Sequence, residues 1–288
     1  MRPYNWSMAM AFTKPTVKLG LPRLGSGKSR HTDMMEFLST GILVGFKGRG
    51  AGVNYPTPAM RASIQAAGVQ ARNIIRIAND EMAKVMFLRK QESALFTNTM
   101  TTHFNLAPGN LGGVLKDNVV DKSLSVMAVF VKDRRWVLEK IRQGFLSLSF
   151  HLNTGMYLID MDTATRTVED GNVIPVGTAT VADGYVQQRA GGTCTCGFAN
   201  GEIHIDFNDV PTYSLNSVAR LIIHEAAHKY LNVDDKRYAK DAPYPPSLTD
   251  CLDNADSFAW AAVSLATGSV KMPATNSTHW NNCPGGAI

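Results

Sequence analysis

Residues 218–231 read VARLIIHEAAHKYL, and this stretch decides how the rest of the chain is interpreted. Its apolar residues recur at helical spacing, and Ser214 or Asn216 just upstream can cap a helix. His224 and His228 are four residues apart, so both imidazoles project from one face of that helix. The stretch therefore predicts an amphipathic helix that presents two metal-ligating side chains together.

The spacing of these side chains predicts a hydrolytic metal site. Two imidazole nitrogens placed in this way can share one tetrahedral zinc ion at about 2.0–2.1 Å. Glu225 follows the first histidine directly, beside the metal but not pointed at it, where its carboxylate can take a proton from an activated water. We therefore predict His224 and His228 as zinc ligands and Glu225 as the general base. The alternative interpretation is two surface histidines that flank a glutamate.

Zinc requires a third protein ligand, and the downstream sequence limits the choice. No Gly-x-x-His follows His228, which excludes the metzincin extension, and no glutamate occurs after Glu225, which excludes the thermolysin-like ligand. The remaining carboxylates belong to Asp234, Asp235, Asp241, Asp250, Asp253 and Asp256. An aspartate just past the helix is a reasonable oxygen ligand beside two histidines.

Three segments resemble the aspzincin metallopeptidases, also called the deuterolysin family. They are ARLIIHEAAH at 219–228, DKRY at 235–238 and NADSF at 254–258. That family carries a metal-binding helix, then an Asp-x-x-Tyr element, then a helix that opens with Asn-Ala-Asp, and the order here is the same. The resemblance covers about residues 56–288, although its specific motifs lie within 218–260.

The resemblance implies a role for each matching residue. The implied zinc ligands are His224, His228 and Asp235. Asp234 beside them is the alternative third ligand, because the connection from the helix is shorter than is usual in the family. Tyr238 would donate its hydroxyl to the oxyanion of the tetrahedral intermediate. Asp256 would border the pocket for the residue after the scissile bond, or it would cap the helix that begins there.

The implied fold is α+β and zincin-like, with a helical N-terminal half, a small antiparallel sheet and an active-site helix. Hydrophobic periodicity gives the element boundaries. The predicted helices cover about 58–87, 92–104 and 118–146, and the predicted strands cover 41–46, 148–152, 157–160, 178–181 and 202–207. The last of these strands is expected at the edge of the sheet, beside the active-site cleft.

The positive charge is concentrated at the N-terminus. Residues 1–50 contain eight basic and two acidic residues, whereas the net charge of the whole chain is +5. We predict a basic, flexible extension over 1–55 and a catalytic domain over 56–288. No nucleic-acid-binding motif accompanies the charge, and no apolar run is long enough for a membrane span, so neither nucleic acid nor a spanning helix is expected.

Cysteine content and the N-terminal sequence bear on the cellular compartment and the partners of the protein. Four cysteines, Cys194, Cys196, Cys251 and Cys283, allow either two disulfide bridges or four free thiols. No secretory signal peptide is evident at the N-terminus. Family analogy then suggests a secreted or toxin-like effector delivered by a specialised secretion system, with a delivery machine and a cognate inhibitor or immunity protein as partners.

These patterns favour a zinc metalloendopeptidase that acts on protein or peptide substrates. A zinc amidase that acts on peptidoglycan peptides would use the same metal chemistry in a different cleft. A metal-stabilised interaction protein without turnover is the third hypothesis, and replacement of Glu225 separates it from the two enzymes.

Overall fold

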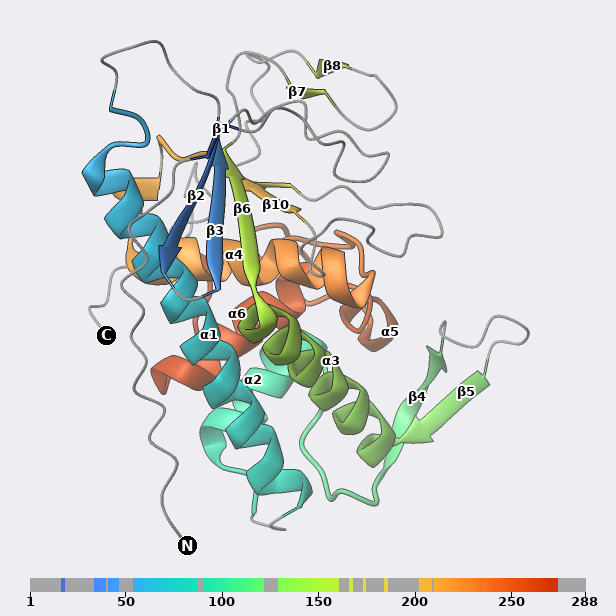
Figure 1. Ribbon diagram of the computed structural model, residues 1–288. Coiled ribbons are helices and arrows are strands. Elements are labelled where there is room, and N and C mark those ends of the chain that lie inside the picture. Colours follow the sequence, from blue (N-terminus) through green and yellow to red (C-terminus); the bar gives the residue numbers. More distant parts are fainter. Residues whose placement is uncertain are drawn as a thin grey trace, which may run out of the picture.

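The computed structural model describes residues 17–18, 34–39, 41–46, 54–87, 91–121, 129–160, 166–167, 173–174, 184–185, 202–208 and 210–273. They form a mixed α+β fold, which confirms the predicted fold class (Figure 1). The helices are α1 (Pro58–Met86), α2 (Ala94–Phe104), α3 (Arg134–Thr154), α4 (Leu215–Leu231), α5 (Leu248–Cys251) and α6 (Ala255–Thr267), with a short 3-10 helix η1 (Val210–Thr212).

The main sheet has six strands in the order β1-β2-β3-β6-β10-β9. Its strands are β1 (Val17–Lys18), β2 (Met34–Ser39), β3 (Ile42–Phe46), β6 (Met156–Asp160), β9 (Gly184–Tyr185) and β10 (Glu202–Ile205). The prediction of an antiparallel sheet is wrong at the centre, where β3, β6 and β10 run parallel. Parallel neighbours need long crossover connections, and α1 to α3 supply the one between β3 and β6. Two small ribbons, β4 (Val114–Asp121) with β5 (Val129–Asp133) and β7 (Arg166–Thr167) with β8 (Val173–Ile174), complete the described strands.

The position of β10 corrects the predicted edge strand at 202–207. β10 pairs in parallel with β6 on one side and in antiparallel with β9 on the other. Among the described residues β9 is therefore the strand at this end of the sheet. The predicted strand at 178–181 lies outside the described residues.

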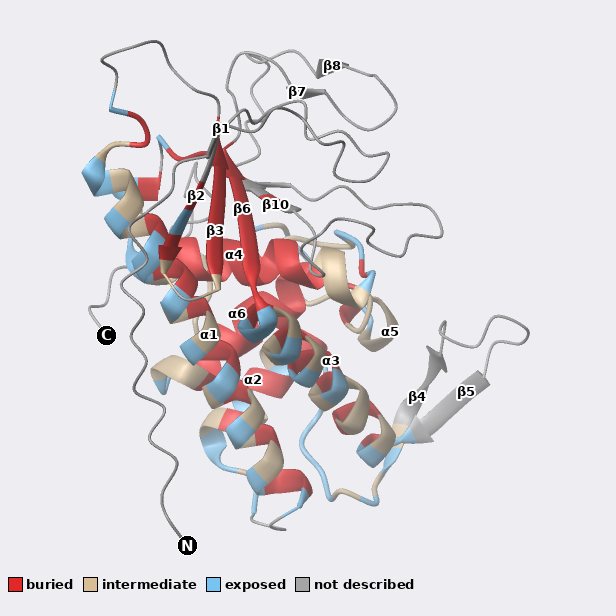
Figure 2. Ribbon diagram, viewed as in Figure 1, coloured by how far each residue is buried: buried red, intermediate tan, exposed pale blue. Residues whose placement is uncertain are grey.

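The predicted boundary at residue 55 is also wrong. β2 and β3 come from the region expected to be a flexible extension, yet β3 is a central strand whose residues are all buried (Figure 2). An ion pair between Glu36 and Arg61 also joins β2 to α1 at 2.8 Å. The folded domain therefore includes β2 and β3, upstream of the predicted boundary, and the predicted strand at 41–46 is confirmed as β3.

The helix predictions are confirmed in two of the three N-terminal regions. α1 begins after the cap Thr57, whose Oγ1 accepts the Met60 amide at 3.2 Å, and α2 begins after Ser93. The predicted helix at 118–146 is wrong in its first part, where the chain forms β4 and β5. The predicted strand at 148–152 is instead the continuation of α3, since Leu148 and Leu152 extend its buried apolar face.

The helices pack closely around one core, and Figure 2 shows α4 and α6 buried along most of their length. α3 packs tightly against α6 at Gly144, where an added Cβ atom would lie 2.5 Å from Cε1 of Phe258. No helix in the described part of the chain is both long and apolar enough to cross a membrane. Cys251 is a buried free thiol, whereas the other three cysteines lie outside the described residues.

We expect Gly144→Ala to lower the free energy of unfolding by about 1–2 kcal/mol, because the added methyl group overpacks the contact with Phe258. The loss is expected although alanine is the better helix former by about 1 kcal/mol. Urea unfolding of the variant checks this. Gly112→Ala is the control, since a Cβ there meets no atom within 4 Å. Equal stability of the Gly144 variant and wild type would contradict the close packing.

Candidate metal centre

The predicted helix at 218–231 is present as α4, and its ends fix the surrounding chain. Ser214 caps its start by accepting the Ser217 amide at 3.2 Å. Asn232 ends it in the left-handed conformation, with φ 54°, a backbone that asparagine tolerates better than most residues. The following residues can therefore turn back beside the helix, and this turn brings Asp235 to the two histidines.

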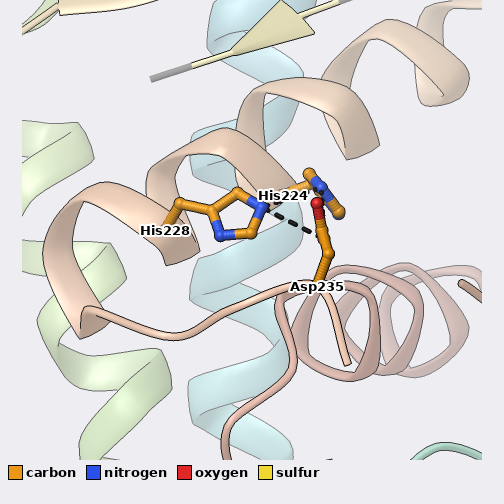
Figure 3. A group of neighbouring side chains, drawn as sticks. All are labelled: His224, His228 and Asp235. Carbon is orange, nitrogen blue, oxygen red and sulfur yellow. Dashed lines mark hydrogen bonds and ion pairs between the residues drawn. The ribbon is translucent and has the colours of Figure 1, made fainter. Parts of the chain in front are cut away.

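Three side-chain atoms that could bind a metal ion form a small triangle (Figure 3). Two come from histidines of α4 and one from an aspartate in the segment after α4. Nε2 of His224 lies 3.1 Å from Nε2 of His228, and Oδ1 of Asp235 lies 3.3 Å and 3.1 Å from these nitrogens. Ligand atoms at tetrahedral angles about 2.0–2.1 Å from zinc would lie about 3.3–3.4 Å from one another. The two nitrogens and one oxygen therefore fit one zinc ion in both geometry and ligand chemistry.

The other nitrogen of each imidazole fixes the ring orientation. Nδ1 of His224 lies 2.9 Å from Oδ1 of Asp256, and Nδ1 of His228 lies 2.7 Å from the carbonyl oxygen of Val233. Each Nδ1 can donate its proton to these acceptors, which leaves each Nε2 lone pair for a metal. Metal-binding histidines usually donate their other ring N–H to a carboxylate or a backbone carbonyl, as these two can.

The charges around the triangle favour a cation. Burial lowers the pKa of His224, but hydrogen bonds to Asp235 and Asp256 outweigh it and raise that pKa to about 10. Burial raises the pKa of Asp235, but hydrogen bonds from His224 and His228 hold it well below its usual range. A metal ion at this site would therefore take the place of a proton between the histidines and the carboxylate.

Asp235, not Asp234, faces the histidines. The Asp234 side chain is 56% exposed and pairs with Nζ of Lys236 on the surface, whereas the Asp235 side chain is 32% exposed. The geometry thus favours the first of the two predicted third ligands.

Glu225 and Tyr238 lie at the same centre. Glu225 is 3% exposed, and burial raises its pKa against the opposing charges of His224 and His228. Tyr238 donates its hydroxyl to Oδ2 of Asp235 at 2.7 Å, and its ring stacks on that of His224 at a centroid distance of 6.2 Å. Both predicted catalytic side chains therefore lie near the triangle: Glu225 interacts electrostatically with all three of its residues, and Tyr238 is hydrogen-bonded to Asp235.

Asp256 does not fit either predicted role. Asp256 is only 1% exposed. Its carboxylate accepts hydrogen bonds from His224, from Nη1 of Arg220 at 3.1 Å and from the Ala239 amide at 2.7 Å. The buried carboxylate is directed at these protein groups instead of a substrate pocket. The residue that precedes α6 as its cap is Asn254, not Asp256. Asp256 orients a proposed ligand and anchors the segment that contains Tyr238.

Two further residues of this region received no role from the sequence. Arg220 is buried in α4, with its guanidinium 4.9 Å from the centre of the Trp260 ring and in contact with Asp256. Asn254 is also buried and binds the backbone next to Asp235. The sequence feature that could have pointed to Arg220 is a charged residue within an apolar helical stripe. For Asn254 the feature is its place in the Asn-Ala-Asp segment.

Comparison of the chain with protein-family models, with curated proteins and with solved structures found no match. Only the residues and the geometry of this chain therefore point to its function.

Proposed function

We propose that this protein is a zinc-dependent metalloendopeptidase. The observation that supports the proposal most strongly is the triangle of His224 Nε2, His228 Nε2 and Asp235 Oδ1, whose sides of 3.1–3.3 Å suit one tetrahedral zinc. Glu225 lies next in sequence to one of these ligands, on the same buried helix. Two histidines, a carboxylate ligand and a nearby free carboxylate together provide what metal-assisted hydrolysis needs.

Each side chain has a distinct task in this proposal. A bound zinc ion would polarise the scissile carbonyl and lower the pKa of water toward neutrality. Glu225 would take a proton from the attacking water and pass it to the amine that leaves when the C–N bond breaks. Tyr238 would exchange its hydrogen bond with Asp235 for one to the oxyanion of the tetrahedral intermediate.

The sheet supports a polypeptide substrate. β9 lies at the end of the described sheet, pairs antiparallel with β10 and also contacts α4. An extended peptide could add to β9 by strand pairing and so pass close to α4. In this proposal β9, and not residues 202–207, is the edge strand that pairs with the substrate. The edge strand beside the helix α4 is the basis for proposing a zincin-like fold.

Casein cleavage by the purified full chain tests the proposal. We expect about one zinc per chain, release of peptides from casein, loss of cleavage with 1,10-phenanthroline and recovery on addition of zinc. Digestion of purified peptidoglycan instead of casein would favour the zinc amidase. Bound zinc without hydrolysis of either would favour the interaction protein, and absence of zinc binding would overturn all three hypotheses.

A further inference from the structure

The loop that carries Asp235 has no regular secondary structure, and the start of α6 holds it. The Asp234 amide donates to the carbonyl oxygen of Asp253 at 3.1 Å, and the Ala255 amide donates to that of Asp234 at 3.0 Å. These two bonds fix the backbone immediately before Asp235.

The side chain of Asn254 fixes the backbone immediately after Asp235. Its Oδ1 accepts the amides of Lys236 at 3.0 Å and Arg237 at 3.2 Å. Its Nδ2 donates to the carbonyl oxygen of Arg237 at 2.9 Å and to Oγ of Ser257 at 3.0 Å. An asparagine amide offers two acceptor and two donor positions, so its hydrogen-bonding capacity is fully used. Asn254 is 0% exposed, which keeps water from competing for these bonds.

We propose that Asn254 is a positioning residue that sets Asp235 against the two histidines before metal binds. It acts through the backbone of residues 236–237 and does not touch the proposed ligand carboxylate. Asp256, two residues later, contacts the other segment of the site directly, because its carboxylate accepts hydrogen bonds from His224 and from the Ala239 amide. The start of α6 thus supports ligands from both segments of the site. The inference rests on the zinc site of the proposed function but not on peptide hydrolysis.

The direct test is the zinc affinity of Asn254→Ala, measured by competition with a chromophoric chelator. We expect binding about 10- to 100-fold weaker than in wild type, the range typical for loss of an outer support of a metal ligand. Cobalt(II) replaces zinc in a second measurement, because its visible spectrum reports coordination geometry. We expect an altered spectrum, which a loss of stability alone would not produce.

A matched control is Asn79→Ala. The Asn79 amide donates to the Phe145 carbonyl oxygen at 3.1 Å and joins α1 to α3 away from the site. This variant should bind zinc with unchanged affinity and give the wild-type cobalt spectrum. Thermal unfolding of the metal-free proteins shows whether the two substitutions cost comparable stability.

The outcomes separate the inference from the proposed function. Wild-type zinc affinity and an unchanged cobalt spectrum in Asn254→Ala would overturn the inference. If this variant does not fold, Asn254→Ser takes its place, since the shorter serine side chain cannot reach both amides. We expect Asn254→Ser to bind zinc at least about fivefold more weakly than wild type, and wild-type affinity would overturn the inference. Weakened zinc binding in the variant, together with a wild-type protein that binds zinc but cleaves no casein, would support the inference and refute the peptidase.

Discussion

Glu225→Gln is expected to retain zinc and to lower casein cleavage by on the order of 10²- to 10⁴-fold, the usual contribution of a general base. Glutamine has nearly the same shape as glutamate but cannot accept the proton of the attacking water. The triangle of His224, His228 and Asp235 does not include Glu225, so the proposed ligands keep their places. Initial cleavage rates and elemental analysis of the same preparation measure both effects.

Glu139→Gln is the matched control for this substitution. Glu139 lies on α3 and pairs with Arg142 on the helix surface, with 32% of its side chain exposed. Its replacement should leave zinc content and cleavage unchanged. Cleavage that survives in Glu225→Gln would refute the assignment of the base, whereas loss of zinc in that variant would show that Glu225 supports the metal site itself.

Asp235→Ala should weaken zinc binding by more than about 100-fold, because loss of a direct ligand costs more than loss of an outer support. It should therefore contain little zinc after dialysis and cleave no casein. Asp234→Ala should keep both properties, since Asp234 is exposed and pairs with Lys236 on the surface. The two adjacent aspartates give a matched pair in which only one carboxylate faces the histidines.

Zinc content after dialysis and chelator competition distinguish these variants. Loss of zinc in Asp234→Ala with retention in Asp235→Ala would make Asp234 the third ligand. Retention in both would exclude an aspartate from this loop as a ligand. Neither result depends on the choice of substrate.

Elements determined by local pattern could be predicted from the sequence. α1, α2 and α4 have long apolar stripes and clear caps, so their positions were predicted within a few residues. Residues 148–152 were misassigned because a short apolar run suits a strand as well as the end of a helix. Parallel pairing of β3 with β6 depends on residues far apart in the sequence, and no local pattern reports it.

The same distinction holds for the candidate site. His224, Glu225 and His228 follow from spacing on one helix, whereas Asp235 was implied only by the family resemblance, with Asp234 as the alternative. The structure places Asp235 beside the two histidines. The hydrogen bonds of Asp256 could not be predicted, because they depend on the packing of α6 against α4. Cleavage of peptides and the identity of the metal stay predictions.

The central place of β3 affects how the protein can be shortened. A chain that begins at residue 56 would lack β2 and β3, and the edge of β6 that pairs with β3 would be open. An apolar strand with unpaired amides and carbonyls is a template for strand pairing between molecules, and hence for aggregation. Insolubility of such a fragment would reflect the missing strands and would carry no information about the proposed catalytic side chains.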